Sequence, residues 1–184
     1  MFNECRKIQG KDMLTLITGG SKSGRSALGE KLLSQSAGEK IYIATMMPFG
    51  EEAARTIEHH RQIRSGKGFV TKEVYYDLHT ADIPQKSSVL IEDAVNLLAN
   101  EMFEKNEQDP VGKILSAVGD LAEKCGNVIV ITSTVELDRE DYTAEVKDYV
   151  RKLGAMGCEL AAIADSVYET VFGIPVLVSG HVRT

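Results

Sequence analysis

A glycine-rich segment near the start of the sequence has the residue types that bind phosphate. Glycines let the backbone turn successive N–H groups toward one anion, and a helix that follows adds the positive end of its dipole. The spacing matches a GxxxxGK(S/T) phosphate loop, with Ser26 as a candidate Mg²⁺ ligand. We predict a nucleoside triphosphate site, and a glycine-rich turn without a ligand is the alternative. The segment comprises Gly19, Gly20, Ser21, Lys22, Ser23, Gly24, Arg25 and Ser26.

One position of this loop departs from the pattern, because Arg25 stands where the pattern has lysine. A guanidinium is a wide planar fork, whereas an ammonium is a compact point charge. Phosphate binding is compatible with either cation, but in-line phosphoryl transfer depends on how the groups are positioned. Lys22 offers a second cation in the same loop. The loop therefore predicts phosphate binding and leaves phosphoryl transfer open.

Two adjacent histidines lie in the charged segment IEHHRQIR, residues 57–64. Neighbouring residues on a helix point about 100° apart, so His59 and His60 do not form a natural metal pair. A histidine can instead act as a nucleophile on phosphorus, with Arg61 and Arg64 neutralising phosphate charge. The alternative is a solvated helical face with incidental histidines, which composition alone favours.

Two acidic residues, Glu92 and Asp93, follow the apolar run SVLI. Acids at the carboxyl end of a strand often hold Mg²⁺ or a ligand hydroxyl in nucleotide-binding folds. The alternative is that a strand-terminal acid caps the next helix. The local sequence favours neither of these two interpretations.

Apolar runs that suit strands alternate with helical patterns along the chain. Nearly continuous apolar runs favour strands that are buried on both faces of a parallel sheet. The predicted class is α/β, a P-loop nucleotide-binding fold whose mostly parallel sheet is flanked by helices, with the last two strands as a candidate antiparallel pair. The expected strands are residues 13–18, 40–45, 88–92, 127–133, 166–172 and 175–179.

Two helices between these strands have clear signals in the sequence. The first has Asp109 as its N-cap, proline at the next position, and Gly126 just past its end. The second spans residues 146–163, and Gly154 and Gly157 are expected to weaken or break it.

The remaining segments complete the expected organisation. A third helix starts at the glycine-rich loop and ends before Gly38, and the polar residues 65–72 are expected to form a mobile surface loop. Residues 1–12 are read as a polar arm, and residues 13–184 as a single nucleotide-binding domain.

Composition narrows the function classes. The net charge of −6 disfavours a general nucleic-acid or anionic-membrane surface. No apolar run has the length that a bilayer-spanning helix needs. The cysteines Cys5, Cys125 and Cys158 are widely separated, which argues against a disulfide framework or structural zinc and favours the cytoplasm.

Five segments, in this order, carry a resemblance to a known family. GGSKSGRS is similar to its GGxxSGKS loop, YIAT at residues 42–45 to its second strand, and AARTIEHHRQIR to the segment of its guanylylated histidine. IEDAVNLLANEMF has Asn100 at the family's asparagine, and ADSVYETVFGIPVLVSG is similar to its C-terminal ADEV…VSG. From residue 14 to residue 180, the chain resembles the bifunctional adenosylcobinamide kinase and adenosylcobinamide-phosphate guanylyltransferase family of cobalamin biosynthesis.

The resemblance implies roles for particular residues. His60 would carry the guanylyl group covalently, and Arg25 would belong to the catalytic phosphate loop. Glu73, in a TKE that is similar to the family's TxE, and Glu92 would contact the guanine nucleotide. The implied nucleotide-binding residues are Gly19, Gly20, Ser21, Lys22, Ser23, Gly24, Arg25, Ser26, Ala44, Thr45, Arg61, Gln62, Ile63, Arg64, Glu73 and Glu92.

The resemblance also implies a reaction. Phosphate would pass from ATP or GTP to the aminopropanol hydroxyl of adenosylcobinamide, and GMP would then pass from GTP through His60 to that phosphate. Mg²⁺, with Ser26 as a ligand, would balance the triphosphate charge. A cytoplasmic homotrimer that acts on small molecules is implied likewise.

Departures from the family pattern keep other functions open. Besides Arg25, Gly157-Cys158 replaces an asparagine-glutamine pair, residues 133–136 (STVE) replace NEVG, and the loop after His60 is one residue longer. The main alternative is a paralogue without turnover that binds GTP, ATP or a corrinoid as a regulator or scaffold. A P-loop kinase that acts on a different small alcohol is the third hypothesis.

Overall fold

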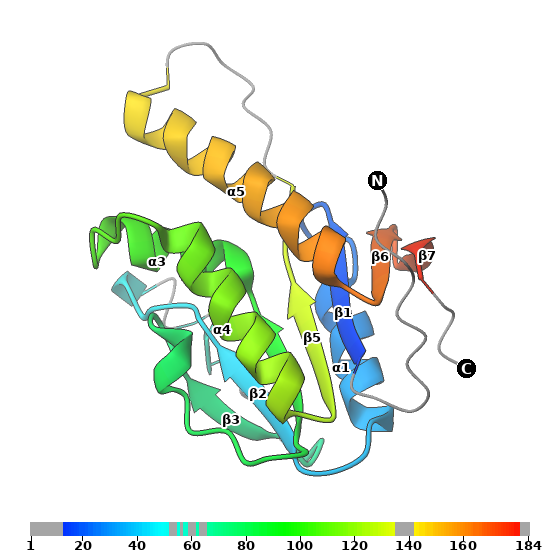
Figure 1. Ribbon diagram of the computed structural model, residues 1–184. Helices are drawn as coiled ribbons and strands as arrows, with labels where there is room; N and C mark the ends of the chain where they lie inside the picture. Colours follow the sequence, from blue (N-terminus) through cyan, green and yellow to red (C-terminus); the bar gives the residue numbers. More distant parts are fainter. Residues whose placement is uncertain are drawn as a thin grey trace.

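The computed structural model describes residues 13–51, 55, 57–58, 62, 66–134 and 142–180, and its arrangement is shown in Figure 1. The expected arm at residues 1–12 lies outside the described residues. The division of the chain into an arm and one domain therefore stays a prediction. Within the described residues, no helix has the combined length and apolar character needed to cross a membrane.

One seven-stranded sheet forms the centre of the molecule. Its strands are β1 (Met13–Gly19), β2 (Lys40–Ala44), β3 (Val70–Glu73), β4 (Ser88–Glu92), β5 (Asn127–Ile131), β6 (Ser166–Val171) and β7 (Ile174–Ser179). Their order across the sheet is β3-β2-β4-β5-β1-β6-β7, and all neighbours are parallel except β6 and β7. The predicted α/β class with an antiparallel pair at its end is confirmed.

Helices cover both faces of this sheet (Figure 1). Helix α1 (Arg25–Gln35) lies on one face, where its Leu32 and Leu33 pack against β-strand side chains. Helices α3 (Ala94–Phe103), α4 (Pro110–Lys124) and α5 (Ala144–Ile163) lie on the other face, and a short 3₁₀ helix spans Leu78–Thr80. Because the paired strands β1 to β6 are parallel, their carboxyl ends lie together at one end of the sheet, where ligands bind in such folds.

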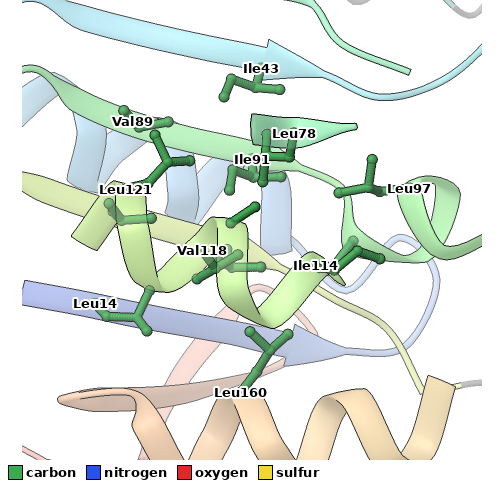
Figure 2. Packing of buried hydrophobic residues seen from close by; sticks show 14 of the residues in the cluster. Leu14, Ile43, Leu78, Val89, Ile91, Leu97, Ile114, Val118, Leu121 and Leu160 are labelled. Carbon is green, nitrogen blue, oxygen red and sulfur yellow. The ribbon is translucent and has the colours of Figure 1, made fainter. Parts of the chain in front are cut away.

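The larger core lies between the sheet and α3 to α5, as Figure 2 shows. Successive strand residues point to opposite faces, so Ile41 and Ile43 belong to this core whereas Tyr42 points toward α1. Apolar residues of the strands meet a helical stripe whose members recur every three or four positions. The labelled members are Leu14, Ile43, Leu78, Val89, Ile91, Leu97, Ile114, Val118, Leu121 and Leu160.

Helix α5 corrects one prediction, because it runs unbroken through Gly154 and Gly157. Each helical glycine is unfavourable by about 1 kcal/mol relative to alanine. The buried side chains of Leu153, Met156 and Leu160 on the same helix supply packing that outweighs this penalty. The N-cap prediction for α4 is confirmed, since the Asp109 side chain accepts a hydrogen bond from the Gly112 N–H at 3.0 Å.

A second correction concerns the expected loop at residues 65–72. The structure places Val70–Glu73 in strand β3, which pairs in parallel with β2 at the edge of the sheet. Most of its residues are exposed, so the sequence lacks the buried apolar run that identified the central strands. Two predicted strands also end earlier, β2 at Ala44 and β5 at Ile131.

Candidate active site

The predicted phosphate loop connects β1 to α1 and has an unusual backbone. Gly19 has φ +145°, and a Cβ at this position would lie only 2.6 Å from the Thr170 carbonyl oxygen, so only glycine fits. Lys22 is exposed and adopts a left-handed conformation with φ +56°, which is uncommon for a residue with a side chain. Such conformations persist where surrounding structure holds them, and they cluster at ligand sites.

The surroundings hold the loop from two sides. The Ser23 hydroxyl hydrogen-bonds the Thr170 hydroxyl at 2.7 Å, and the Gly173 N–H donates to the Ser23 carbonyl oxygen at 2.8 Å. On the other side, the Ser133 hydroxyl donates to the Gly19 carbonyl oxygen at 3.3 Å. The end of β6, the β6–β7 turn and Ser133, two residues after β5, therefore fix the conformation of the loop.

The first turn of α1 differs from those of the other long helices in the described residues. Side chains of Asp93, Asp109 and Thr143 cap α3, α4 and α5, whereas the N-cap of α1 is Gly24 without a side-chain hydrogen bond. No acidic residue lies in the first turn of α1. Its first N–H groups and the positive end of its dipole are therefore available to an anion.

Arg25, at the lysine position of the phosphate loop, is held by the backbone of another segment. Its Nη1 donates a hydrogen bond to the carbonyl oxygen of Thr132, just after β5. The guanidinium thus links the start of α1 to the carboxyl end of β5. The exposed Lys22 is the loop cation that remains on the surface.

Ser26 and Glu92, which the sequence placed at separate motifs, are in direct contact. The Ser26 hydroxyl donates to one Glu92 carboxylate oxygen, and the Tyr42 hydroxyl donates to the other at 2.6 Å. Hydroxyl and carboxylate oxygens are ligands that Mg²⁺ accepts, usually together with substrate phosphates. The described residues contain no group of three or more metal-binding side chains. The pair therefore fits Mg²⁺ that arrives with a nucleotide, and it does not form a complete protein cage.

Asp93 is fixed by two neighbours. The Thr45 hydroxyl accepts a hydrogen bond from the Asp93 N–H at 2.7 Å and donates to its carbonyl oxygen at 2.8 Å. The Asp93 side chain accepts from the Asn96 N–H at 2.8 Å, so the capping interpretation holds for this residue. Burial raises the pKa of the Asp93 carboxyl above its ordinary value of 3.8, and the charge of Glu92 adds to the rise.

This pKa predicts that asparagine at position 93 stabilises the fold at neutral and higher pH. A raised pKa means that the folded chain binds the proton more tightly, so stability falls as pH rises from the unfolded value through the folded one. Asparagine cannot ionise and is an equally good N-cap. We expect Asp93→Asn to raise the melting temperature more at pH 8 than at pH 4.5. Asp109→Asn, at the exposed cap of α4, controls for the change of cap, and an equal gain at both pH values would contradict the prediction.

The predicted residues Ala44, Glu73 and Glu92 line one pocket at the carboxyl ends of β2, β3 and β4. Thr45 is fully buried and is not one of the residues found to line this pocket; its hydroxyl positions Asp93 instead. Sequence reasoning missed other lining residues, because their side chains come from separate strands and helices. The one available signal was Tyr42, a polar hydroxyl within an apolar strand. Asp93, the second strand-end acid singled out in the sequence, also lines the pocket, and the lining residues that were not predicted are Tyr42, Met46, Ile57 and Asn96.

The histidine segment is described only in part. His60, Arg61, Ile63 and Arg64 lie outside the described residues. Gln62 is exposed, and its side chain donates a hydrogen bond to Glu58 at 3.1 Å. Ile57, three residues before His60 in the sequence, lines the same pocket as Glu73 and Glu92.

Fold and loop together define the class of protein. The chain has a P-loop nucleotide-binding fold. A solved protein from Pyrococcus horikoshii OT3 superimposes with a TM-score of 0.53 at 6% identity, covering 91% of this chain and 86% of that chain. A solved ATPase domain gives a TM-score of 0.51 at 12% identity, covering 88% of this chain and 70% of that chain. At these identities the likeness shows the fold alone.

The family follows from sequence. The family model described as cobinamide kinase / cobinamide phosphate guanyltransferase matches residues 15–178, so the chain belongs to this family. The bifunctional adenosylcobalamin biosynthesis protein CobU of Escherichia coli (strain K12) is 27% identical over 179 residues, 89% of this chain and 98% of that protein. The bifunctional adenosylcobalamin biosynthesis protein CobP of Pseudomonas aeruginosa is 27% identical over 171 residues, which cover 92% of this chain and 99% of that protein.

Proposed function

We propose that this chain catalyses both transfers of its family, phosphoryl transfer to adenosylcobinamide and then guanylyl transfer to the product. The observation that carries the proposal is the phosphate loop, which opens onto an uncapped helix beside the Ser26–Glu92 contact. Family membership over residues 15–178 supplies the acceptor. The pocket beside the loop supports a nucleotide whose base lies against Glu73 and Ala44.

The first transfer uses the loop and its acidic neighbours. Backbone N–H groups between Gly19 and Ser26 bind the β- and γ-phosphates, and Lys22 neutralises charge that faces solvent. Ser26 and Glu92 would hold Mg²⁺, which supplies charge neutralisation on the phosphates. The acceptor hydroxyl oxygen attacks the γ-phosphorus, the bond to the β–γ bridging oxygen breaks, and the nucleoside diphosphate leaves. Asp93, which lines the pocket together with Glu92, accepts the hydroxyl proton.

The second transfer uses histidine. An imidazole nitrogen of His60 attacks the α-phosphorus of GTP, the bond to the β-phosphate oxygen breaks, and pyrophosphate leaves. A phosphate oxygen of the acceptor then attacks the same phosphorus, and the N–P bond breaks. Arg61 and Arg64 neutralise the phosphate charge during both steps.

Product analysis tests this proposal. The protein is incubated with adenosylcobinamide, Mg²⁺ and GTP. The corrinoids are then separated, and their masses are measured by mass spectrometry. We expect first a product that carries one added phosphate. A second product should then carry that phosphate together with the transferred GMP. If the corrinoid is recovered unchanged at every enzyme concentration, the proposed function is wrong.

A second candidate function rests on the Arg25–Thr132 hydrogen bond. This bond holds the guanidinium at the end of β5. The second candidate is therefore a protein that binds nucleotide without phosphorylating cobinamide. Arg25→Lys separates the two functions. A marked gain in phosphorylation by Arg25→Lys would support the degenerate kinase. A wild type that phosphorylates cobinamide at least as fast as Arg25→Lys would support a kinase that works with arginine. The rate of cobinamide phosphorylation at saturating GTP is the measurement.

We also propose that the protein is a cytoplasmic homotrimer, as family resemblance implies. Strand β7 supports self-association, because it is an edge strand whose Ile174, Val176 and Val178 are exposed and which contains no charged residue. Phe172 in the preceding turn is almost fully exposed, at 95%. Light scattering after size-exclusion chromatography should give three times the chain mass of 20.1 kDa, and a monomer at all concentrations would exclude the trimer.

A further inference from the structure

A second cavity, of about 350 Å³, lies between α5 and the carboxyl ends of β1 and β5. Its volume is within the range of small-molecule sites. None of the residues known to line it carries a charge, and most of its surface is apolar. The lining residues that matter below are Thr132, Ser133, Gly154, Gly157 and Cys158.

Helix α5 forms one wall of this cavity, and its two glycines place no side chain there. Gly154 and Gly157 are one helical turn apart, and a Cβ built on either would meet no atom of the described part of the chain within 4 Å. Glycine weakens a helix interior relative to alanine, and nothing crowds these positions. Close packing therefore does not explain the two glycines, and they leave open space at the cavity wall.

The strand wall contains an unpaired polar group. The Thr132 hydroxyl is buried, in a residue that is only 3% exposed, and it has no hydrogen-bond partner among the described residues. Buried hydroxyl groups are nearly always paired, because leaving one unpaired is unfavourable. The hydroxyl oxygen has almost no accessible surface, so a ligand atom in the cavity would satisfy it after rotation of the Thr132 side chain.

The same wall is continuous with the phosphate loop. Ser133 lines the cavity and donates its hydroxyl hydrogen to the Gly19 carbonyl oxygen, and the Thr132 carbonyl oxygen accepts from Arg25. Residues 133–134 and 157–158 are also positions where the chain departs from the family pattern. Two of these departures therefore lie on opposite walls of one cavity.

We propose that this cavity binds a neutral, largely apolar arm of the acceptor and sets the acceptor selectivity of this chain. The inference rests on the proposed function. A neutral arm fits a lining without charge, and one amide or hydroxyl group on it pairs with the Thr132 hydroxyl once that side chain rotates toward the cavity. The amide-linked aminopropanol arm of cobinamide has this chemistry, and binding it here brings the acceptor against the loop that holds the phosphates.

Filling the cavity tests the proposal. Gly157→Leu projects a side chain into the open space, and Gly119→Leu on α4 is the matched control, because its built Cβ also meets nothing within 4 Å. Cobinamide affinity is measured by equilibrium dialysis in the presence of a non-hydrolysable GTP analogue. We expect Gly157→Leu to weaken cobinamide binding by about tenfold or more, as steric misfit in a pocket does. GTP analogue affinity should stay unchanged, and Gly119→Leu should behave as wild type.

Cys158 gives a second test that needs no mutation. It is exposed and lines the cavity, whereas Cys125 is buried. Iodoacetamide labelling of the wild-type chain, followed by peptide mass spectrometry, should show that cobinamide slows alkylation of Cys158 and that GTP alone does not. If wild type binds no cobinamide in dialysis, the proposed function itself has failed. If wild type binds it, but Cys158 stays unprotected and Gly157→Leu keeps full affinity, the cavity is not the acceptor site.

Discussion

Replacing Glu92 by glutamine is expected to lower kcat/KM for both transfers by about 100-fold or more. The Glu92 carboxylate accepts hydrogen bonds from the Ser26 and Tyr42 hydroxyls at the end of β4. Glutamine keeps the shape of the side chain but removes the negative charge that Mg²⁺ needs, and its amide N–H₂ cannot accept from both hydroxyls. The assay measures initial rates with cobinamide and with cobinamide phosphate over a range of Mg²⁺ concentrations.

The control for this substitution is Glu39→Gln. Glu39 is exposed and lies just before β2. It is therefore at the amino ends of the parallel strands, whereas the phosphate loop is at their carboxyl ends. Glu39→Gln should retain wild-type rates. Partial recovery of Glu92→Gln at high Mg²⁺ would support a role in holding the ion. Wild-type rates for Glu92→Gln at low Mg²⁺ would show that the carboxylate does not take part.

Replacing His60 by alanine is expected to abolish covalent labelling of the protein by GTP. We assign the phosphorus–nitrogen bond to His60, and alanine has no atom that could replace the imidazole nitrogen. The protein is incubated with GTP labelled at the α-phosphorus and precipitated, and the acid-labile label is counted. The phosphorylation of cobinamide should persist, because the phosphate loop is unchanged.

The neighbouring histidine provides the matched control. His59→Ala makes the same chemical change one residue away, where a helical side chain would point about 100° from its neighbour. We expect His59→Ala to retain the label. If His60→Ala labels as well as wild type, or if His59→Ala alone loses the label, the assignment of the nucleophile is wrong.

Local sequence was sufficient to predict the phosphate loop, because its glycines, its strand and its helix are contiguous. Helix caps such as Asp109 were predictable for the same reason. The edge strand β3 was not, because exposure removed its apolar signal. The continuity of α5 depends on core contacts of Leu153 and Met156, which a propensity scale for single residues does not include.

Contacts between distant segments could not be predicted from local patterns. Arg25 and Thr132 are 107 positions apart, and the register of β1 against β5 decides that they meet. Ser26 and Glu92 were both candidates, but parallel packing of strands was needed to bring them into contact. The cavity beside α5 could not be predicted either. Gly154 and Gly157 predicted a weakened or broken helix, whereas in the structure they line this cavity within an unbroken helix.

A crystal structure with Mg²⁺ and a non-hydrolysable GTP analogue tests most directly whether residues 19–26 hold the nucleotide. We predict that the β-phosphate lies within hydrogen-bond distance of the backbone N–H groups at the start of α1. We also expect the ion to contact the Ser26 hydroxyl, with Glu92 beside it. Phosphate density elsewhere on the molecule, with these N–H groups directed away from it, would contradict the assignment of the loop.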